Sequence, residues 1–188
     1  MQKIMKNNNI EGVGRKKFKV MTTDSNHDLP IADRVFKTEQ HDSQVVKSNQ
    51  FWAGDITYVA TDEGWLYLSI FLDLFTRKVV GHAMSSRMTA DLVIESLNMS
   101  LRHQGLVCAH ELTASMSRKG NCYDNAFVES FFRTLKVELT YRRRFKTLSE
   151  ARAAIFEFIE VWYNRKRLHS SLGYQTPMSY EHQTLTAA

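Results

Sequence analysis

The stretch FWAGDITYVATDEGWLYLSIFLDLFTRKVVGHAMSS, residues 51–86, carries the clearest signal of strands in the chain. It contains three runs rich in aromatic and β-branched side chains, the composition typical of strands, at 52–61, 65–75 and 79–86. The turn sequence TDEG ends the first run, and a short TRK link separates the second run from the third. Because short links join antiparallel neighbours, these runs predict a three-stranded meander, in which the almost wholly apolar second strand is buried on both faces.

Three helices are predicted after the meander. Thr89 is suited to cap the first, with Asp91 in its first turn, and Asp124 or Asn125 can cap the second. The third begins with a capping box, TLSE at 147–150, and a polar stretch, RLHSSLGYQTP, follows it. The apolar stripes recur at helical spacing and consist of Val93, Leu97 and Leu101, then Val128, Phe131, Phe132, Leu135 and Leu139, then Ala151, Ile155, Phe158, Ile159 and Trp162.

The segment GLVCAHELTASMS, residues 105–117, lies between the first two of these helices. It holds two short apolar runs with only Cys108 to Glu111 between them. Three antiparallel strands followed by helices and parallel strands is the order of a ribonuclease-H-like α/β sheet, whose parallel neighbours need a crossover of about a dozen residues. This link is too short for such a crossover. Periodicity alone does not single out this fold, but a ribonuclease-H-like order would here mean a mixed sheet with a truncated parallel part, and one merged or shortened strand beside the strand that contains Asp55.

The length and charge of the chain limit its class. Its 188 residues suffice for one domain with a core and additional arms, and we expect an arm or linker at 1–50, a core at 51–181 truncated near 107–111, and a tail at 182–188. A net charge of +5 favours an acidic partner, most commonly nucleic acid, although a basic protein without such a partner is the alternative.

The sequence also favours a reducing compartment. Cys108 and Cys122 are too few for a disulfide scaffold and lack zinc-ligand spacing, so we expect free thiols in the cytoplasm. The N-terminal MQKIMKNNNI has no apolar core of signal-peptide length, and the run WLYLSIFLDLF is too short to span a bilayer. No Gly-rich phosphate loop and no Ser-His-Asp order occurs in the sequence.

Three acidic residues lie in sequence surroundings where a carboxylate needs a physical explanation. Asp55 lies in a mostly apolar strand, where a metal ion, an exposed edge or a basic partner would each account for it. Glu129 lies off its helix stripe, and in isolation it would be solvated and paired with Arg133. The turn places Asp73 roughly across from Asp55, where a cation would be needed between them; alternatively the two point to different faces, or Asp73 caps the turn before Arg77.

Two basic clusters, at 142–144 and 165–167, suit a nucleic-acid partner. Basic side chains neutralise phosphates, and aromatic rings can stack on bases. Solvated helix ends are the alternative, because cations are favoured there in any case. The interleaved rings are those of Tyr141, Trp162, Tyr163 and His169.

Several segments together closely resemble the catalytic core of bacterial insertion-sequence transposases. They are FWAGDITYVATDEGWLYLSIFLDLFTRKVVGHAMS, SMSRKGNCYDNAFVESFFRTLKVEL and YNRKRLHSSLGYQTP. The family branch has two overlapping reading frames, and its second frame carries a retroviral-integrase-type core. The resemblance runs in order from about Thr22 to Glu181, and MTTDSNHDLPIA is similar to the linker that follows the family's helix-turn-helix segment.

The resemblance implies a ribonuclease-H-like fold and a site of three acids, Asp, Asp and Glu, that hold two Mg²⁺ (or Mn²⁺) ions. One ion activates water or a 3′-hydroxyl and the other stabilises the leaving oxygen. Asp55 in the W-x-G-D-I-T-Y context matches the first acid, and Glu129 in D-N-A-x-x-E-S-F-F matches the third.

The family's second acid is absent. It belongs to a His-Ser-Asp-Arg-Gly-like motif at the end of the fourth strand, but here the chain passes directly from that strand into sequence similar to the entrance of the fifth. The candidates for a substitute acid are Asp73, Glu111 and Asp124. From the same resemblance we expect only the linker of the helix-turn-helix segment to be represented, and recognition of the element's terminal repeats to be lost.

By resemblance, the chain is a cytoplasmic bacterial transposase core for DNA integration, impaired by the missing acid. Its partners would be DNA, at the element ends and the target, and further copies of itself. Two alternatives are a non-catalytic DNA-binding or transposase-interfering remnant, and a fragment that folds poorly. The residues expected to bind DNA are Lys119, Arg142, Arg143, Arg144, Arg165, Lys166 and Arg167.

Overall fold

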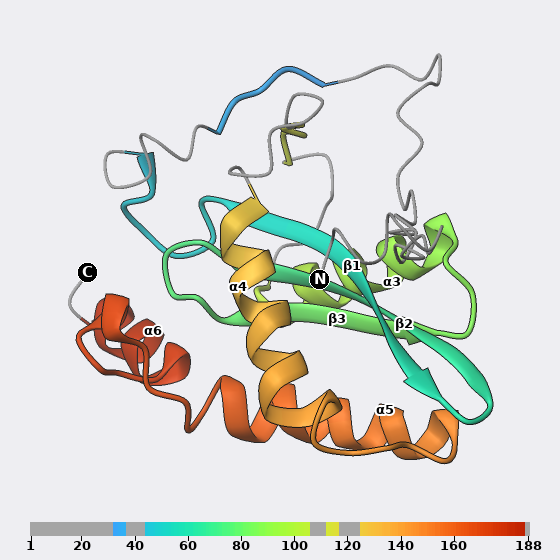
Figure 1. The fold of residues 1–188 in the computed structure, drawn as a ribbon. Helices are drawn as coiled ribbons and strands as arrows, with labels where there is room; N and C mark the ends of the chain where they lie inside the picture. Colours follow the sequence, from blue (N-terminus) through green and yellow to red (C-terminus); the bar gives the residue numbers. More distant parts are fainter. Residues whose placement is uncertain (1–31, 37–43, 106–111, 117–124, 187–188) are drawn as a thin grey trace, which may run out of the picture. The chain divides into compact units, whose positions relative to one another are not determined.

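The computed structural model describes residues 32–36, 44–105, 112–116 and 125–186. Three strands form one antiparallel sheet in the order β1-β2-β3 (Figure 1), with β1 at Trp52–Thr61, β2 at Gly64–Asp73 and β3 at Val79–Ser85. The predicted meander is therefore confirmed. The central strand β2 is also largely buried along its length, as its apolar composition predicts.

The β1–β2 hairpin sets the register of the site strand. Thr61 pairs with Gly64 across a two-residue turn, and Thr61 Oγ1 donates a hydrogen bond of 2.8 Å to the carbonyl of Gly64. Gly64 has a φ of +124°, a conformation that glycine adopts without the steric cost of a side chain. The resulting register pairs Asp55 with Ile70.

The helices that follow are α3 (Ala90–His103), α4 (Ala126–Leu135) with its π-helical continuation η4 (Lys136–Thr140), α5 (Leu148–Glu157) with its π-helical continuation η5 (Phe158–Tyr163), the 3₁₀ helix η6 (Ser170–Leu172) and α6 (Pro177–Thr186). The three predicted helices are confirmed as α3, α4 and α5. The predicted cap of α5 is also present, because Thr147 Oγ1 accepts a 3.0 Å hydrogen bond from Glu150 N. Within the described ranges, no helix is long and apolar enough to cross a membrane.

The helix α6 differs from the expected tail at 182–188. It begins at Pro177 and continues to Thr186. Proline is favoured at the first position of a helix, so Pro177 marks a helix start rather than the end of a loop. Two contacts attach the helix to the link between β2 and β3: Lys78 Nζ forms a 2.6 Å ion pair with Glu181, and the rings of Phe75 and Tyr180 lie 5.4 Å apart.

The main core lies on the sheet face that α4 and α5 cover (Figure 1). Alternate residues of a strand share a face, so the even-numbered apolar side chains of β2 point to this core. The members of this core that are at most 2% exposed are Leu66, Leu68, Ile70, Leu72, Leu74, Val79, Val128, Phe131, Leu135, Phe145, Ala151, Ile155 and Ile159. The core explains why the stripes of α4 and α5 are apolar.

The helix α3 covers the opposite face of the sheet, and small residues let it approach closely (Figure 1). Ser69 Oγ of β2 lies 2.8 Å from Ser96 Oγ of α3. Gly81 of β3 lies beneath the same helix, and a Cβ at this position would collide with Ser100 Oγ and the carbonyl of Ser96. This close packing follows from the side-chain sizes and not from an apolar stripe.

The compact unit begins earlier than the expected core boundary at residue 51. It starts at Ile31. Phe36 and Val45 are buried in the main core, and the rings of Phe36 and Phe51 lie 5.3 Å apart. Part of the predicted arm at 1–50 therefore supplies core side chains.

The merged strand was expected at the edge of β1 that does not pair with β2. Residues 112–116 form no strand; instead Ser115 Oγ accepts hydrogen bonds from the amides of Val35 and Phe36, at 3.0 and 3.1 Å. Within the described ranges, β1 pairs only with β2, apart from a single bridge between Thr61 and Phe145. The expectation of a strand beside β1 is therefore wrong for 112–116, and the rest of the predicted parallel part lies outside the described residues.

Candidate active site

Asp55 lies on β1 with its side chain on the sheet face that α4 covers. Directly paired residues of an antiparallel sheet share a face, and Asp55 pairs with the core residue Ile70. Its Oδ2 accepts a hydrogen bond of 2.9 Å from Asn125 Nδ2, and its Oδ1 accepts one of 2.8 Å from the amide of Ile56. Both carboxylate oxygens thus contact neutral donors.

The second of these donors belongs to the free edge of the sheet. The pair Phe51 and Leu74 is hydrogen-bonded across the strands, and such pairs alternate with non-bonded ones along an antiparallel ladder. The amide of Ile56 therefore points away from β2, toward the side where β1 has no partner strand among the described residues. The Asp55 side chain accepts a hydrogen bond from this amide, in the place that a carbonyl of a neighbouring strand would otherwise take.

The pKa of Asp55 is raised above its ordinary value. Asp55 as a whole residue is exposed, but its carboxyl is partly enclosed, and this burial disfavours the charged form. The hydrogen bonds from Ile56 and Asn125 act in the opposite direction and are the smaller effect. A bound cation would reverse the balance and favour the carboxylate.

Glu129 lies one helical turn beyond the residue that contacts Asp55. Asn125 is the N-cap of α4, and residues four apart on a helix lie on the same side, separated by about 6 Å. Glu129 is exposed, and within the described ranges it forms no ion pair, so it lacks the pairing with Arg133 that was the alternative reading for an isolated glutamate. Its side chain is exposed, and four residues of helix place it on the same side of α4 as Asn125, which contacts β1.

Asp73 is not brought to Asp55, and the expected cross-strand placement is wrong. It pairs with Trp52, three residues from Asp55, and an odd offset puts the two side chains on opposite faces. Asp73 is only 1% exposed, and burial raises its pKa.

Instead, Asp73 organises the turn between β2 and β3. Its Oδ1 accepts hydrogen bonds from Phe75 N at 3.0 Å, Thr76 N at 2.7 Å and Thr76 Oγ1 at 2.9 Å, and its Oδ2 accepts one from Asn49 N at 2.6 Å. The alternative reading from the sequence, a cap on the turn before Arg77, describes this geometry. A hairpin centred on the TDEG turn pairs Asp55 with Ile70, so the cross-strand reading was in error by three residues of register.

The residues present fit a hard divalent cation only in part. Carboxylate oxygens with solvent access suit Mg²⁺ or Mn²⁺. However, no group of three or more His, Cys, Asp or Glu side chains gathers within the described ranges. The other candidate acids, Glu111 and Asp124, lie outside these ranges, as does Lys119. Asn125 also belongs to the site, although the sequence indicated only that it could cap a helix. Its position four residues before Glu129 was the one feature of the sequence that could have suggested this role.

The two basic clusters differ in their partners. Arg142, Arg143 and Arg144 each pair with a carboxylate, at 3.3 Å from Glu138, 2.8 Å from Glu150 and 2.8 Å from Asp62. Arg165 and Lys166 are exposed and form no ion pair within the described ranges. The positive charge of the second cluster is therefore the more available to a phosphate.

Comparison with known proteins identifies the family. The sequence profile of the integrase core domain matches residues 45–143, and a second profile of the same description matches residues 110–177. The chain is 43% identical over 188 residues to the insertion element IS600 uncharacterized 31 kDa protein of Shigella sonnei, covering 88% of this chain and 68% of that protein. It is 42% identical over 181 residues to transposase InsF for insertion sequence IS3fB of Escherichia coli strain K12, covering 85% of this chain and 62% of that transposase.

The alignments are longer than the part of this chain that they contain. The alignment to the Shigella sonnei protein runs over 188 residues but takes in 88% of a chain of the same length. Part of the relative therefore has no counterpart here, which agrees with the expected internal deletion. The chain spans about 62% of the length of the InsF transposase. With its antiparallel meander, flanking helices and acid-bearing strand, the chain belongs to the ribonuclease-H-like integrase core family of bacterial insertion-sequence transposases.

Proposed function

We propose that the chain acts on DNA by divalent-metal-dependent phosphoryl transfer, with an incomplete set of acids and therefore impaired activity. Asp55 and Glu129 are the ligands that would hold Mg²⁺ or Mn²⁺. A cation there would neutralise charge on the phosphate and on the attacking oxygen. The protein's own part is to hold the two carboxylates on one side of α4.

The hydrogen bond from Asn125 to Asp55 is the observation that carries the proposal. It holds the N-terminal turn of α4 against β1, so Glu129 follows one turn later on the same flank. The neutral donors on both oxygens of Asp55 must be displaced, at least in part, before a cation binds. Loss of the second acid together with this displacement explains why low activity is expected.

The proposed partner is DNA, bound at element ends or at a target, with a second copy of the chain as a further partner. The expected DNA contacts are Arg165, Lys166 and Arg167, with Arg142, Arg143 and Arg144 less available because each is ion-paired. Neutralised phosphates would make binding strongly salt-dependent. We also propose that the chain acts in the cytoplasm.

The first experiment is nicking of supercoiled plasmid by the purified chain in Mg²⁺ and in Mn²⁺. The variants are Asp55→Asn and Glu129→Gln, which preserve side-chain shape. The matched control is Glu157→Gln, an exposed carboxylate at the end of α5 that forms none of the ion pairs of the two basic clusters. Nicking that both site variants abolish and the control retains supports the proposal.

The second candidate function is non-catalytic DNA binding that interferes with a full-length relative. The absence of a third acid near Asp55 within the described ranges favours it. It predicts that wild type and all variants are equally inert in nicking, yet bind DNA. A chain that melts without cooperativity would contradict both functions and support a fragment that folds poorly.

A further inference from the structure

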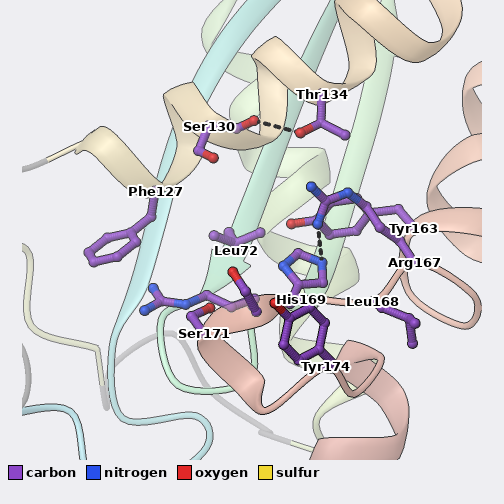
Figure 2. Close-up of a pocket in the computed structure, with 12 residues that line it drawn as sticks. Leu72, Phe127, Ser130, Thr134, Tyr163, Arg167, Leu168, His169, Ser171 and Tyr174 are labelled. Atoms are coloured by element: carbon purple, nitrogen blue, oxygen red, sulfur yellow. Dashed lines mark hydrogen bonds between the residues drawn. The ribbon is translucent and has the colours of Figure 1, made fainter.

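A cavity of about 440 Å³ lies between α4, the β2–β3 turn and the segment 167–174. Figure 2 shows Phe127, Ser130 and Thr134 of α4 on one wall and Arg167, His169 and Tyr174 on the other. Within the described ranges, no Asp or Glu lines the cavity, although two arginines do. Such a lining suits an anion.

Among the residues that the structure describes, Arg167 contacts neutral groups and forms no ion pair. Its Nη1 donates a 3.0 Å hydrogen bond to His169 Nε2, and its guanidinium carbon lies 5.7 Å from the centre of the Tyr163 ring. His169 can accept because burial, together with the charges of Arg167 and Arg77, lowers its pKa to about 4. Arg142, Arg143 and Arg144 are instead paired with carboxylates. Arg167 is thus oriented without being neutralised.

Arg77 supplies the second guanidinium. It stands in the left-handed region with a φ of +61°, and its guanidinium carbon lies 4.0 Å from the centre of the Phe127 ring. The turn organised by Asp73 sets this position. Arg77 and Arg167 both act on His169, so their charges converge on one cavity. Guanidinium groups are the side chains best matched to phosphate oxygens.

The cavity is too large for a phosphate group alone. Its aromatic walls, Phe127 and Tyr174, suit the sugar or base of a nucleotide, since aromatic rings stack on bases of any sequence. Ser130 and Ser171 add hydroxyl groups that can donate to phosphate oxygens. A nucleotide unit therefore fits the cavity better than a free ion.

The cavity and the acids lie on two flanks of the same helix. Phe127, Ser130 and Thr134 are three to seven residues apart and share one side of α4 (Figure 2). Glu129 directly precedes Ser130 but is turned from it by about 100° around the helix axis. A strand held in the cavity can therefore cross the outer side of α4 toward Asp55 and Glu129.

We infer that this cavity binds one nucleotide unit of a DNA strand, with the phosphate on Arg77 and Arg167 and the sugar or base against Phe127 and Tyr174. The inference rests on the proposed function, and it names where a strand is held outside the acid site. Arg167 is the central contact, His169 positions it, and Ser130 stands at the wall nearest the acids.

The test is fluorescence anisotropy of a labelled single-stranded oligonucleotide, titrated with the full chain in EDTA over a range of salt concentrations. Arg167→Gln should weaken binding about tenfold and reduce the slope of log K against log salt by about 0.7. Ser130→Glu, which adds a carboxylate to the cavity wall, should weaken binding at least as much. Both variants should melt like wild type.

The controls change the same charges elsewhere. Arg87→Gln removes an exposed arginine at the far end of β3 from Arg77, and Asn98→Glu adds an acid on α3, across the sheet. Equal losses in the control and cavity variants, or no loss in the cavity variants, would overturn the inference.

Two further outcomes separate the proposals. Cleavage plays no part in a titration in EDTA, so wild type that binds DNA independently of Arg167 overturns the cavity alone, whereas wild type that binds no DNA overturns the proposed function with it. If inorganic phosphate binds the wild type and needs Arg167 while the oligonucleotide does not, the cavity serves a free anion and the strand inference fails.

Discussion

Asn125 donates a 2.9 Å hydrogen bond from its side-chain amide to Oδ2 of Asp55, which joins the start of α4 to the middle of β1. The two residues are 70 positions apart in the sequence. This contact places a neutral amide beside the carboxylate of Asp55, which is proposed to bind a cation. Position 125 is therefore one at which a substitution can introduce an acid beside Asp55.

Asn125→Asp should create a tighter cation site. The new carboxylate would lie beside Asp55, and two carboxylates at this distance repel unless a cation sits between them. Without metal, the melting temperature should therefore fall. Mn²⁺ should raise the melting temperature of the variant more than that of the wild type, because it binds the folded site. Differential scanning fluorimetry with and without Mn²⁺ measures both effects.

Asn98→Asp serves as the matched control for this change. Asn98 is exposed on α3, so the same substitution adds the same charge away from the site. An equal Mn²⁺ response in the two variants would mean that added charge alone, and not the neighbourhood of Asp55, accounts for the effect.

The raised pKa of Asp55 predicts a specific pH dependence of stability. The folded chain holds the proton to higher pH than the unfolded chain does, so between the two pKa values the folded state binds more protons. Stability therefore falls as pH rises through this window, which begins near the unfolded value. Asp55→Asn cannot titrate, so wild type should lose melting temperature relative to this variant as pH rises from about 3.8. Parallel curves for the two proteins would contradict the assigned shift.

Most of the fold could be predicted from the sequence, because the turn, link and capping signals of single segments agree with the observed structure. The meander follows from the TDEG turn and short TRK link, and α5 follows from its capping box. The position of α3 could not be read from an apolar stripe, because its approach depends on Gly81, Ser96 and Ser100. The helix α6 was missed because its composition is polar and its start is marked only by Pro177.

The resemblance to the family predicted the acids of the candidate site. Reasoning from the expected geometry of the strands predicted little else about the site. Asp55 and Glu129 lie on neighbouring elements, but the sequence placed Asp73 beside Asp55 through a register error that reverses the face. The cavity between α4 and the segment 167–174 was not predicted. Its arginines, Arg77 and Arg167, are 90 residues apart, and no local period connects them.

Gly81→Ala should destabilise the protein by about 1 to 3 kcal/mol. The new methyl would collide with Ser100 Oγ and with the carbonyl of Ser96, and a carbonyl cannot move away as a side chain can. Urea unfolding gives the free energy directly. Gly81→Ala combined with Ser100→Ala should recover only part of the loss, because the carbonyl contact persists. Full recovery would assign the clash to the serine hydroxyl alone.

Asn164→Asp should destabilise the protein by about 3 kcal/mol or more. Asn164 is only 3% exposed, and its side chain makes a matched pair of 3.0 Å hydrogen bonds with Val79: Oδ1 accepts from the amide and Nδ2 donates to the carbonyl. These bonds tie the end of η5 to the first residue of β3. Aspartate would lose the donor and bury a charge against a carbonyl oxygen. Asn98→Asp, exposed on α3, should change the free energy of unfolding far less. Because protonation restores a donor to the aspartate, the deficit should shrink as pH falls, and a deficit that stays constant with pH would assign the loss to packing.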